Sequence, residues 1–314
     1  MIYKKITINP KSWFITPWES DTILSYVFAW AFMQNRWDII KIFEDFRAKN
    51  PPFLITNWFA SYEDKVYISK PIYFFENLKK SKLSLKDAIL NEKKRKRLKK
   101  VDKILLRREI LEKIFSWKEL DDQTRAEFIK QKEIYQNLTK EDEVWKNMIP
   151  RFNSWETNPY SIIVTFVKQI VVYVKIFDKE KFKSFYSFLK EVFETIWYWA
   201  GKSRWFWKIE KVELKDLNEE EKKTFEYLEE LRRNWIYLVL NNYKPTEEEL
   251  KNIDLSRSFI DINWKNTKTL WELNEKFFKW RMNFIKEGSV IISGEKLKGD
   301  FYESNGSYNF GYMF

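Results

Sequence analysis

The sequence of 314 residues contains no histidine and no cysteine. Without imidazole and thiol groups it can form no Ser-His-Asp triad, no cysteine nucleophile and no zinc site of histidine and cysteine ligands. Any catalysis would have to use carboxylate, lysine, tyrosine or serine side chains. We therefore expect a protein that is not an enzyme and has no cofactor. The absence of cysteine also excludes a disulfide framework and agrees with a cytoplasmic location.

Glycine is scarce as well, since the chain has 6 glycines but 16 tryptophans. Average usage would give roughly 22 glycines in a chain of this length. Three tryptophans would complete the turn dipeptide Asn-Gly if they were glycines, at Asn57-Trp58, Asn234-Trp235 and Asn263-Trp264. One hypothesis is that the gene encodes glycine with UGA and that this codon has been translated as tryptophan. The alternative is a tryptophan-rich protein whose indole rings are core or stacking groups.

The sequence also lacks a long hydrophobic run that is free of charge. Its longest apolar stretch, residues 160–177, has the length of a membrane span but contains Lys168, Gln169 and Lys175. Residues 1–9 lack the apolar core of a signal peptide. With 44% hydrophobic residues the chain can bury a sizeable core, and its length suggests two domains. We expect a soluble protein with no membrane partner.

Hydrophobic periodicity predicts an α+β fold. Residues 2–9 alternate as a strand, and Ser20-Asp21 can cap an almost entirely apolar helix over 22–34. Further strands are expected at 65–69, 160–167, 170–177 and 208–214, and a helix at 179–196. With 70–159 set aside, this order resembles the split βαβ (βαββαβ) of ferredoxin-like, RRM-like folds, with one strand more between the two helices. We assign residues 1–215 to a first domain of this type.

The remaining residues, 216–314, form a smaller, β-rich second domain in this interpretation. The acidic segment 216–230 at its start is typical of a linker or connecting helix. Its strand-like segments are 235–240, 258–263, 277–285 and 289–292, with a turn at Glu287-Gly288.

Residues 70–159 form a long insertion in the first domain. Between Lys79 and Lys113 there are 15 Lys and Arg residues against 5 Asp and Glu residues, which accounts for nearly all of the net charge of +11. The most basic tract contains Lys93, Lys94, Arg95, Lys96 and Arg97. Such a tract is typical of an arm that binds RNA phosphates. The alternative is a solvated helical face.

The segment 197–207 joins the expected helix 179–196 to the strand 208–214. Its Gly201-Lys202-Ser203 invites comparison with a P-loop, but the first glycine of that motif would have to be Ile196, and a P-loop leads from a strand into a helix. A glycine-rich loop after a helix can instead bring backbone N–H groups, Lys202 and Arg204 close to a polyanion. A surface loop without a ligand is the alternative. The recoding hypothesis predicts UGA codons at Trp197, Trp199, Trp205 and Trp207, because four indoles in one turn would expose much apolar surface.

With glycine at these tryptophans, the segment resembles a loop of the fourth Csm subunit of type III-A CRISPR effector complexes, a RAMP protein. Other patches match that family in the same order along the chain. They are residues 16–24 (TPWESDTIL), Phe53–Phe59, Lys70–Tyr73 with the following Lys-rich tract, 287–290 (EGSV) and 306–314 (GSYNFGYMF). Each patch is weak alone, but together they span almost the whole chain.

The resemblance implies two ferredoxin-like domains, no nuclease chemistry and a role in holding the 5′ handle of the CRISPR RNA. It implies a position beside the large signalling subunit and the first backbone RAMP subunit, with only indirect contact to target RNA. The family's RNA-contacting loop falls on Trp197, Trp199, Gly201, Lys202, Ser203, Arg204, Trp205 and Trp207, and its strand-to-helix turn on 13–21, with Trp13 and Thr16. If the indoles are real, base stacking replaces close backbone contact.

Two other functions are open. A RAMP endoribonuclease that processes guide-RNA precursors would need a general base and acid, for which Lys202, Tyr198 and scattered carboxylates are the candidates. A polybasic protein of the membrane surface is the other, but the sequence offers no lipid anchor or amphipathic terminal helix to support it.

Overall fold

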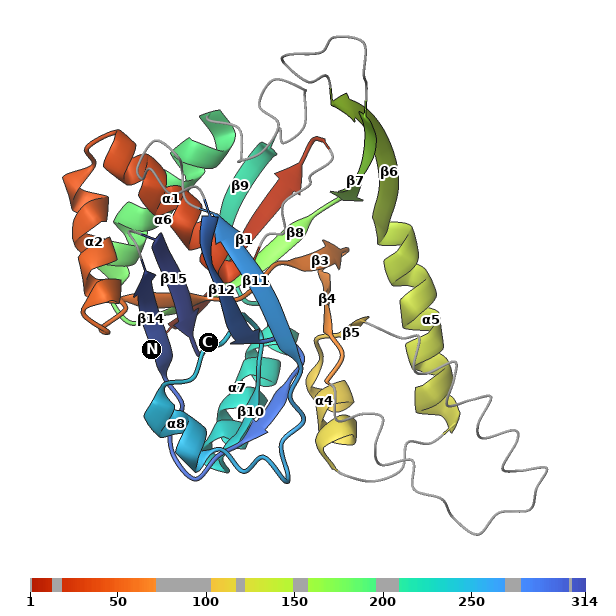
Figure 1. The fold of residues 1–314 in the computed structure, drawn as a ribbon. Coiled ribbons are helices and arrows are strands. Elements are labelled where there is room, and N and C mark those ends of the chain that lie inside the picture. Colours follow the sequence, from red (N-terminus) through yellow and green to blue (C-terminus); the bar gives the residue numbers. More distant parts are fainter. Residues whose placement is uncertain are drawn as a thin grey trace.

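The computed structural model describes residues 2–12, 19–71, 103–116, 122–148, 158–195, 209–268, 278–304 and 307–314. Within them, seven strands form the main sheet in the order β5-β4-β3-β8-β1-β9, and β2 pairs with β8 off this path (Figure 1). The strands are β1 (Ile2–Pro10), β2 (Phe53–Ile55), β3 (Phe59–Tyr62), β4 (Lys65–Ser69), β5 (Lys103–Leu105), β8 (Ile170–Ile176) and β9 (Ile209–Asp216). Their pairings are antiparallel, and together with the helices they form an α+β fold, as expected.

Helices cover both faces of this sheet. The helices are α1 (Ser20–Met33), α2 (Trp37–Arg47), α4 (Arg108–Phe115), α5 (Asp122–Leu138), α6 (Lys179–Thr195), α7 (Glu219–Arg233) and α8 (Glu247–Asn252). Tyr3 of β1 stacks on Phe225 of α7 with a centroid distance of 4.9 Å. On the opposite face, Phe53 of β2 contacts Phe185 of α6 at 4.5 Å and Phe46 of α2 at 5.3 Å. Alternation along the strands therefore places α2 and α6 on one face and α7 on the other.

Four antiparallel strand pairs lie outside the main sheet. They are β6 (Thr139–Met148) with β7 (Asn158–Val167), β10 (Ile236–Leu238) with β13 (Val290–Ile292), β11 (Ile262–Lys268) with β12 (Phe278–Ile285), and β14 (Gly299–Ser304) with β15 (Ser307–Tyr312). The expected strand 160–167 is thus real, but it pairs with β6 and is not part of the main sheet. Its apolar character identified a strand without identifying the partner.

The hydrophobic core joins both halves of the chain. Phe310 of β15 lies 5.5 Å from Phe28 of α1 and 5.3 Å from Phe46 of α2, measured between ring centroids. The same cluster of buried residues includes Leu238 and Val290. It therefore extends across the expected domain boundary at 215/216, while the division into two domains stays a prediction.

Local expectations need three corrections. Of the two alternatives for the acidic segment 216–230, the helix is confirmed and the linker is wrong, because the segment forms α7 from Glu219 and packs on the sheet. Helix α1 begins at Ser20, and the residue before it, Glu19, makes no side-chain cap; the Ser20 N–H donates to Asn57 instead. Asn263-Trp264 lies inside β11 and forms no turn. Each correction reflects a partner that is distant in sequence.

Both edges of the main sheet are capped by side chains. At β9, the Val212 N–H donates to Glu194 of α6 at 2.8 Å, and the Tyr186 hydroxyl donates to the Val212 carbonyl at 3.3 Å. At β5, the Leu105 N–H donates to the buried Gln131 of α5 at 3.1 Å. These bonds occupy backbone groups that edge strands usually leave open.

Candidate nucleic-acid interface

The two loops expected to bind RNA leave the main sheet at the same end. Strand β1 ends at Pro10, which pairs with Ile209 at the start of β9. Strand β8 begins at Ile170, which is paired with Ile8 of β1 and Ala60 of β3. We refer to the described residues at this end, 9–12, 61–65, 168–169 and 209–211, as the loop end (Figure 1). Segments 13–18 and 196–208 therefore attach side by side.

The loop end is braced by hydrogen bonds between strand ends. The Ser61 N–H donates to the Gln169 carbonyl at 3.0 Å, and the Gln169 side chain donates to Asn9 Oδ1 at 3.2 Å. Lys11 lies 3.8 Å from Glu210, in a pair whose two side chains are more than half exposed. Such a pair contributes little to stability because water screens it. The end is therefore stabilised mainly through its backbone, and Lys11 is accessible.

The side chains predicted to contact RNA lie outside the described residues. They are Trp13, Thr16, Lys93, Lys94, Arg95, Lys96, Arg97, Trp197, Trp199, Gly201, Lys202, Ser203, Arg204, Trp205 and Trp207. The structure does fix where their segments attach. The basic arm begins after Pro71 and ends before Lys103. Both of its attachment points are at the end of β4 away from the loop end, where Ser69 pairs with Lys103. The two loops attach instead at the loop end, to β1 and β9.

A polar network around Glu287 connects the residues that flank two of these segments, the loop 13–18 and the basic arm. We name it the Glu287 centre: Ser20, Asn57, Ser69, Lys103 and Glu287. Glu287 accepts hydrogen bonds from the Ser69 N–H at 3.0 Å, from Lys103 at 3.3 Å and from the Asn57 side chain at 3.3 Å. Asn57 Oδ1 in turn accepts from the Ser20 N–H at 2.9 Å. One carboxylate therefore connects the first residue of α1 with both ends of the basic arm.

Glycine is needed beside this carboxylate. Gly288 has a φ of +89°, and a Cβ there would lie 2.9 Å from the Lys70 carbonyl oxygen. A side chain at this position would be both strained and too close to the backbone. Residues of the Glu287 centre fall in or beside the patches 16–24, Phe53–Phe59, Lys70–Tyr73 and 287–290. Sequence reasoning identified the patches but not Asn57, Ser69 or Lys103 as the groups that connect them.

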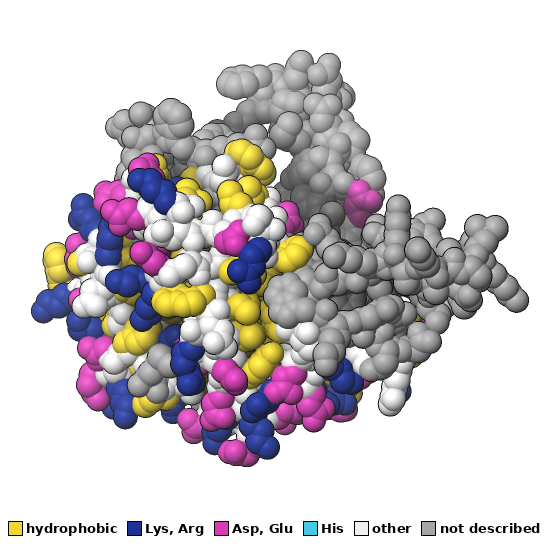
Figure 2. All heavy atoms as spheres, turned by 90° about the horizontal axis from the view of Figure 1, so that it is seen from below, with side chains coloured by type: hydrophobic (Ala, Val, Ile, Leu, Met, Phe, Trp, Pro, Cys, Tyr) yellow, Lys and Arg dark blue, Asp and Glu magenta, His cyan; other side chains and the backbone are white. Residues whose placement is uncertain are grey.

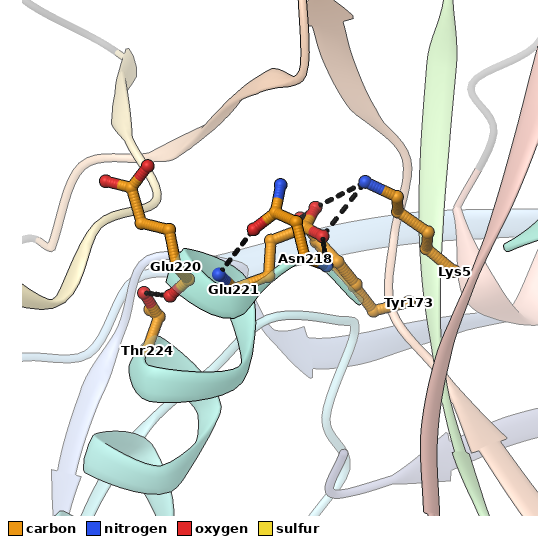
Figure 3. A network of polar contacts seen from close by, with 6 residues as sticks. All are labelled: Lys5, Tyr173, Asn218, Glu220, Glu221 and Thr224. Atoms are coloured by element: carbon orange, nitrogen blue, oxygen red, sulfur yellow. Dashed lines mark hydrogen bonds and ion pairs between the residues drawn. The ribbon is translucent and has the colours of Figure 1, made fainter. Parts of the chain in front are cut away.

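Helix α7 covers part of one face of the main sheet. Figure 3 shows Lys5 of β1 and Tyr173 of β8 converging on Glu221 of α7. Lys5 Nζ lies 2.9 Å from each oxygen of Glu221, and the Tyr173 hydroxyl donates to Glu221 at 2.8 Å. Burial, followed by the Glu221 charge, raises the pKa of Tyr173 well above its usual value. With Tyr173 completely buried, stacking of bases here is excluded.

Glu221 is itself fixed by the start of α7. Its backbone N–H donates to Asn218 Oδ1 at 2.8 Å, and its side chain accepts from the Asn218 N–H at 2.9 Å. This reciprocal capping box satisfies two N–H groups of the first turn. The same carboxylate therefore caps a helix and neutralises a lysine of the sheet.

The described surface carries charges of mixed sign. In Figure 2, which shows the molecule from below, Lys and Arg side chains alternate with Asp and Glu across the coloured face. Among the described residues there is no group of three carboxylates that could hold a metal ion, nor a helix long and apolar enough to cross a membrane. The concentrated positive charge of the sequence is instead in the tract 93–97.

No protein-family model matches the sequence, and neither does any curated protein. Solved structures do match its fold. The chain aligns over 99% of its length with 98% of a chain in the crystal structure of a Csm3-Csm4 subcomplex of the type III-A CRISPR-Cas interference complex, at 16% identity and a TM-score of 0.64. It aligns over 99% with 96% of a chain in the Csm1-Csm4 cassette in complex with cA4, at 16% identity and a TM-score of 0.56. For the cassette with AMPPNP the coverages are the same, the identity is 14% and the TM-score is 0.56. Csm4 is the subunit that these structures share, and the resemblance to the fourth Csm subunit is therefore confirmed at the level of the fold.

Proposed function

We propose that this chain is a non-catalytic, RNA-binding subunit of a type III-A CRISPR complex, in antiviral defence, and that it holds the 5′ handle of the CRISPR RNA. The observation that carries the proposal is the fold match along 99% of the chain to structures that share Csm4. In those structures Csm4 occurs with Csm3 in one case and with Csm1 in the others. By analogy, this chain docks against a large signalling subunit and a backbone RAMP subunit in the cytoplasm, and contacts target RNA indirectly.

The strand arrangement supports a ferredoxin-like first domain. With 70–159 set aside, the elements of the main sheet and its helices follow the order β1-α1-β3-β8-α6-β9, apart from the added α2, β2 and β4. This is the split βαβ order. We assign residues 1–215 to this domain and the smaller β-rich part, 216–314, to a second ferredoxin-like domain.

The RNA contacts divide between two regions in this proposal. Segments 13–18 and 197–207, which attach at the loop end, hold the unstacked bases of the handle with Lys202, Arg204 and the loop backbone. The basic arm neutralises phosphates through Lys93–Arg97 independently of sequence. Support comes from the pairing of Pro10 with Ile209, which brings the attachment points of the two loops together.

Binding of two RNAs at one salt concentration tests the proposal. The purified chain should bind CRISPR RNA with an intact 5′ handle more tightly than the same RNA with that end scrambled. Equal affinity for both would contradict handle recognition. Incubation with repeat RNA is the second measurement, since a subunit without catalysis leaves its length unchanged, whereas shortening would establish the alternative, a guide-processing endoribonuclease.

A further inference from the structure

The loop end carries an ammonium group over the face of an aromatic ring. Tyr62 is the last residue of β3 and is 36% exposed, and Lys168, between β7 and β8, is exposed as well. Lys168 Nζ lies 5.1 Å from the centroid of the Tyr62 ring. Within the described residues no carboxylate forms an ion pair with Lys168. Its positive charge is therefore available to an anion.

The backbone under these two side chains is fixed. Ser61, which precedes Tyr62, donates its N–H to the carbonyl of Gln169, which follows Lys168, at 3.0 Å. Glu63 and Asp64 close the hairpin to β4 with φ angles of 48° and 59°, as a two-residue hairpin turn requires. The backbone that carries the ring and the ammonium is thus fixed at the end of β3 and the start of β8, and β8 pairs with β1, from which the loop 13–18 leaves.

The neighbouring charges favour a nucleotide in one orientation. The Glu63 carboxylate accepts a hydrogen bond from the Tyr62 hydroxyl, and its negative charge, with that of Asp64 beside it in the sequence, disfavours a phosphate on this side. Lys168 supplies the positive charge that a phosphate requires. An exposed ring stacks an unpaired base of any identity.

We propose that Tyr62 and Lys168 form a further contact for one unstacked nucleotide of the guide RNA, with the base on the ring face opposite Lys168 and the phosphate at the ammonium. This proposal rests on the proposed function. It adds a site on described strands to the loops expected from the sequence.

The test compares matched aromatic residues in the full chain. Tyr302 of β14 is 40% exposed and has Lys244 Nζ 3.7 Å from its ring centroid, so it repeats the arrangement away from the strands of the loop end. Affinity for 3′-labelled CRISPR RNA with an intact handle is measured by fluorescence anisotropy. We expect Tyr62→Ala to weaken binding roughly 5- to 100-fold, the range for removal of one base stack. Tyr62→Phe and Tyr302→Ala should stay within about twofold of the parent.

Lys168→Ala gives a second readout. It should flatten the dependence of log K on log salt by about 0.7, as removal of one phosphate contact does on a single strand. Tyr62→Ala affinity equal to that of the parent would overturn this site, and so would an equal loss in Tyr302→Ala. If the parent does not distinguish intact from scrambled handles, the proposed function fails and the site with it. Retained affinity in Tyr62→Ala alongside such a preference in the parent overturns only the site.

A second inference concerns Trp235 and rests on backbone geometry. Trp235 follows the C-cap Asn234 of α7, has a φ of +63° and donates its N–H to the Arg232 carbonyl at 3.0 Å. This is the position after a helix at which the left-handed conformation makes glycine the usual residue. A bulky side chain there is an outlier. The other non-glycine residues with positive φ in the described part are Asn35, Lys49, Glu63 and Asp64.

Exposure of the tryptophans agrees with this geometry. Trp37, Trp235 and Trp264 are 69%, 44% and 55% exposed, whereas phenylalanine and tyrosine fill the described core. Core packing therefore does not explain these indoles. We infer that residue 235 of the native protein is glycine, encoded by UGA, in agreement with the scarcity of glycine in the chain.

Two measurements test this without RNA. The codon for residue 235 should be UGA, and Trp235→Gly should raise Tm by about 1 to 3 °C because the strain is removed. Trp30→Gly is the matched control. Trp30 is half-buried within α1 and packs edge-on against Tyr26, with ring centroids 6.4 Å apart, so glycine there should lower Tm. A UGG codon, or a Tm that falls in Trp235→Gly, would overturn the inference.

Discussion

Two lysines, Lys5 in the main sheet and Lys168 just before strand β8, lie in different environments. Under α7, Lys5 is 5% exposed and both of its ion-pair contacts reach Glu221. At the loop end, Lys168 is exposed and has a tyrosine ring as its neighbour. A buried ammonium must be paired for the fold to be stable, whereas an exposed one is free to bind an anion. The covered part of the sheet therefore maintains the fold, and we assign binding to the loop end.

The sharpest test of this comparison is on the loop itself. Changing Lys202 and Arg204 to Ala should remove two charge-assisted contacts, each about 1.5 to 3 kcal/mol if desolvated, and weaken guide binding by about two to four decades at most. Tm should hardly change, because both groups are predicted to point at RNA. The measurement is affinity for intact and scrambled handles at one salt concentration. A double variant that separates the two RNAs as well as the parent does would remove this loop as the handle site.

For the buried residues under α7 we expect a loss of stability without a loss of RNA preference. Glu221→Ala leaves the Lys5 ammonium buried without its partner, so the free energy of unfolding should fall by about 3 to 5 kcal/mol. Denaturant unfolding measures it, and the preference of the folded fraction for the intact handle should persist. Glu220→Ala is the control: this neighbour pairs with Arg107 at 2.8 Å but is 52% exposed, so its removal should cost less than about 1 kcal/mol. Equal effects of the two variants would contradict the assignment.

The basic arm should contribute to RNA binding, as the loop end does, but without preference for the RNA sequence. Replacing Lys93, Lys94, Arg95, Lys96 and Arg97 with Ser should flatten the salt dependence of log K by about 0.7 for each phosphate that is no longer neutralised. Preference for the handle should survive, because phosphate contacts carry no sequence information. An unchanged slope would identify the tract as a solvated face or a docking surface for an acidic partner.

The smallest expected effect is a pH dependence on the covered side. Burial alone would raise the pKa of Glu229, but the Arg232 charge and hydrogen bonds from Lys175 and Tyr3 outweigh it and lower this pKa to about 2. A lowered folded pKa stabilises the fold above the ordinary value of 4.5 and loses that effect as pH falls toward 2. After screening, Glu229→Gln should cost about 1 to 2 kcal/mol at pH 7 and much less at pH 2.5. Denaturant unfolding of the parent and of Glu229→Gln at the two pH values measures this difference in the free energy of unfolding. If the difference is the same at both pH values, the effect of the substitution comes from packing and not from the charge.

The hydrophobic pattern of the sequence predicted those helices and strands whose buried side chains recur at a regular spacing. Strands β1 and β4 and helix α6 lie within two residues of their expected bounds, since their apolar residues alternate or recur on one helical face. Helix α2 was missed, although its buried Ile39, Ile42, Phe43 and Phe46 have helical spacing. Strands β14 and β15 were also missed, and these pack on α2 and α1 through Phe301 and Phe310.

The candidate site could be predicted from the sequence only in part. Its segments could be recognised from sequence, but the contacts that join them could not. Asn57 and Glu287 are 230 residues apart, and Ser69 and Glu287 are 218 apart. No periodicity reports a pairing over that separation. The partner of β7 could not be predicted for the same reason, because an apolar strand fits either a sheet or a hairpin.

The capped edges of the main sheet constrain how a larger assembly can form. A neighbouring subunit cannot extend the sheet by adding a strand at Val212 or Leu105 unless it first displaces Glu194 and Tyr186, or Gln131. Strand addition from copy to copy is a route to uncontrolled fibres, and side chains placed on an edge block it. At Val212 and Leu105, contacts with a neighbouring protein are therefore limited to side-chain surfaces.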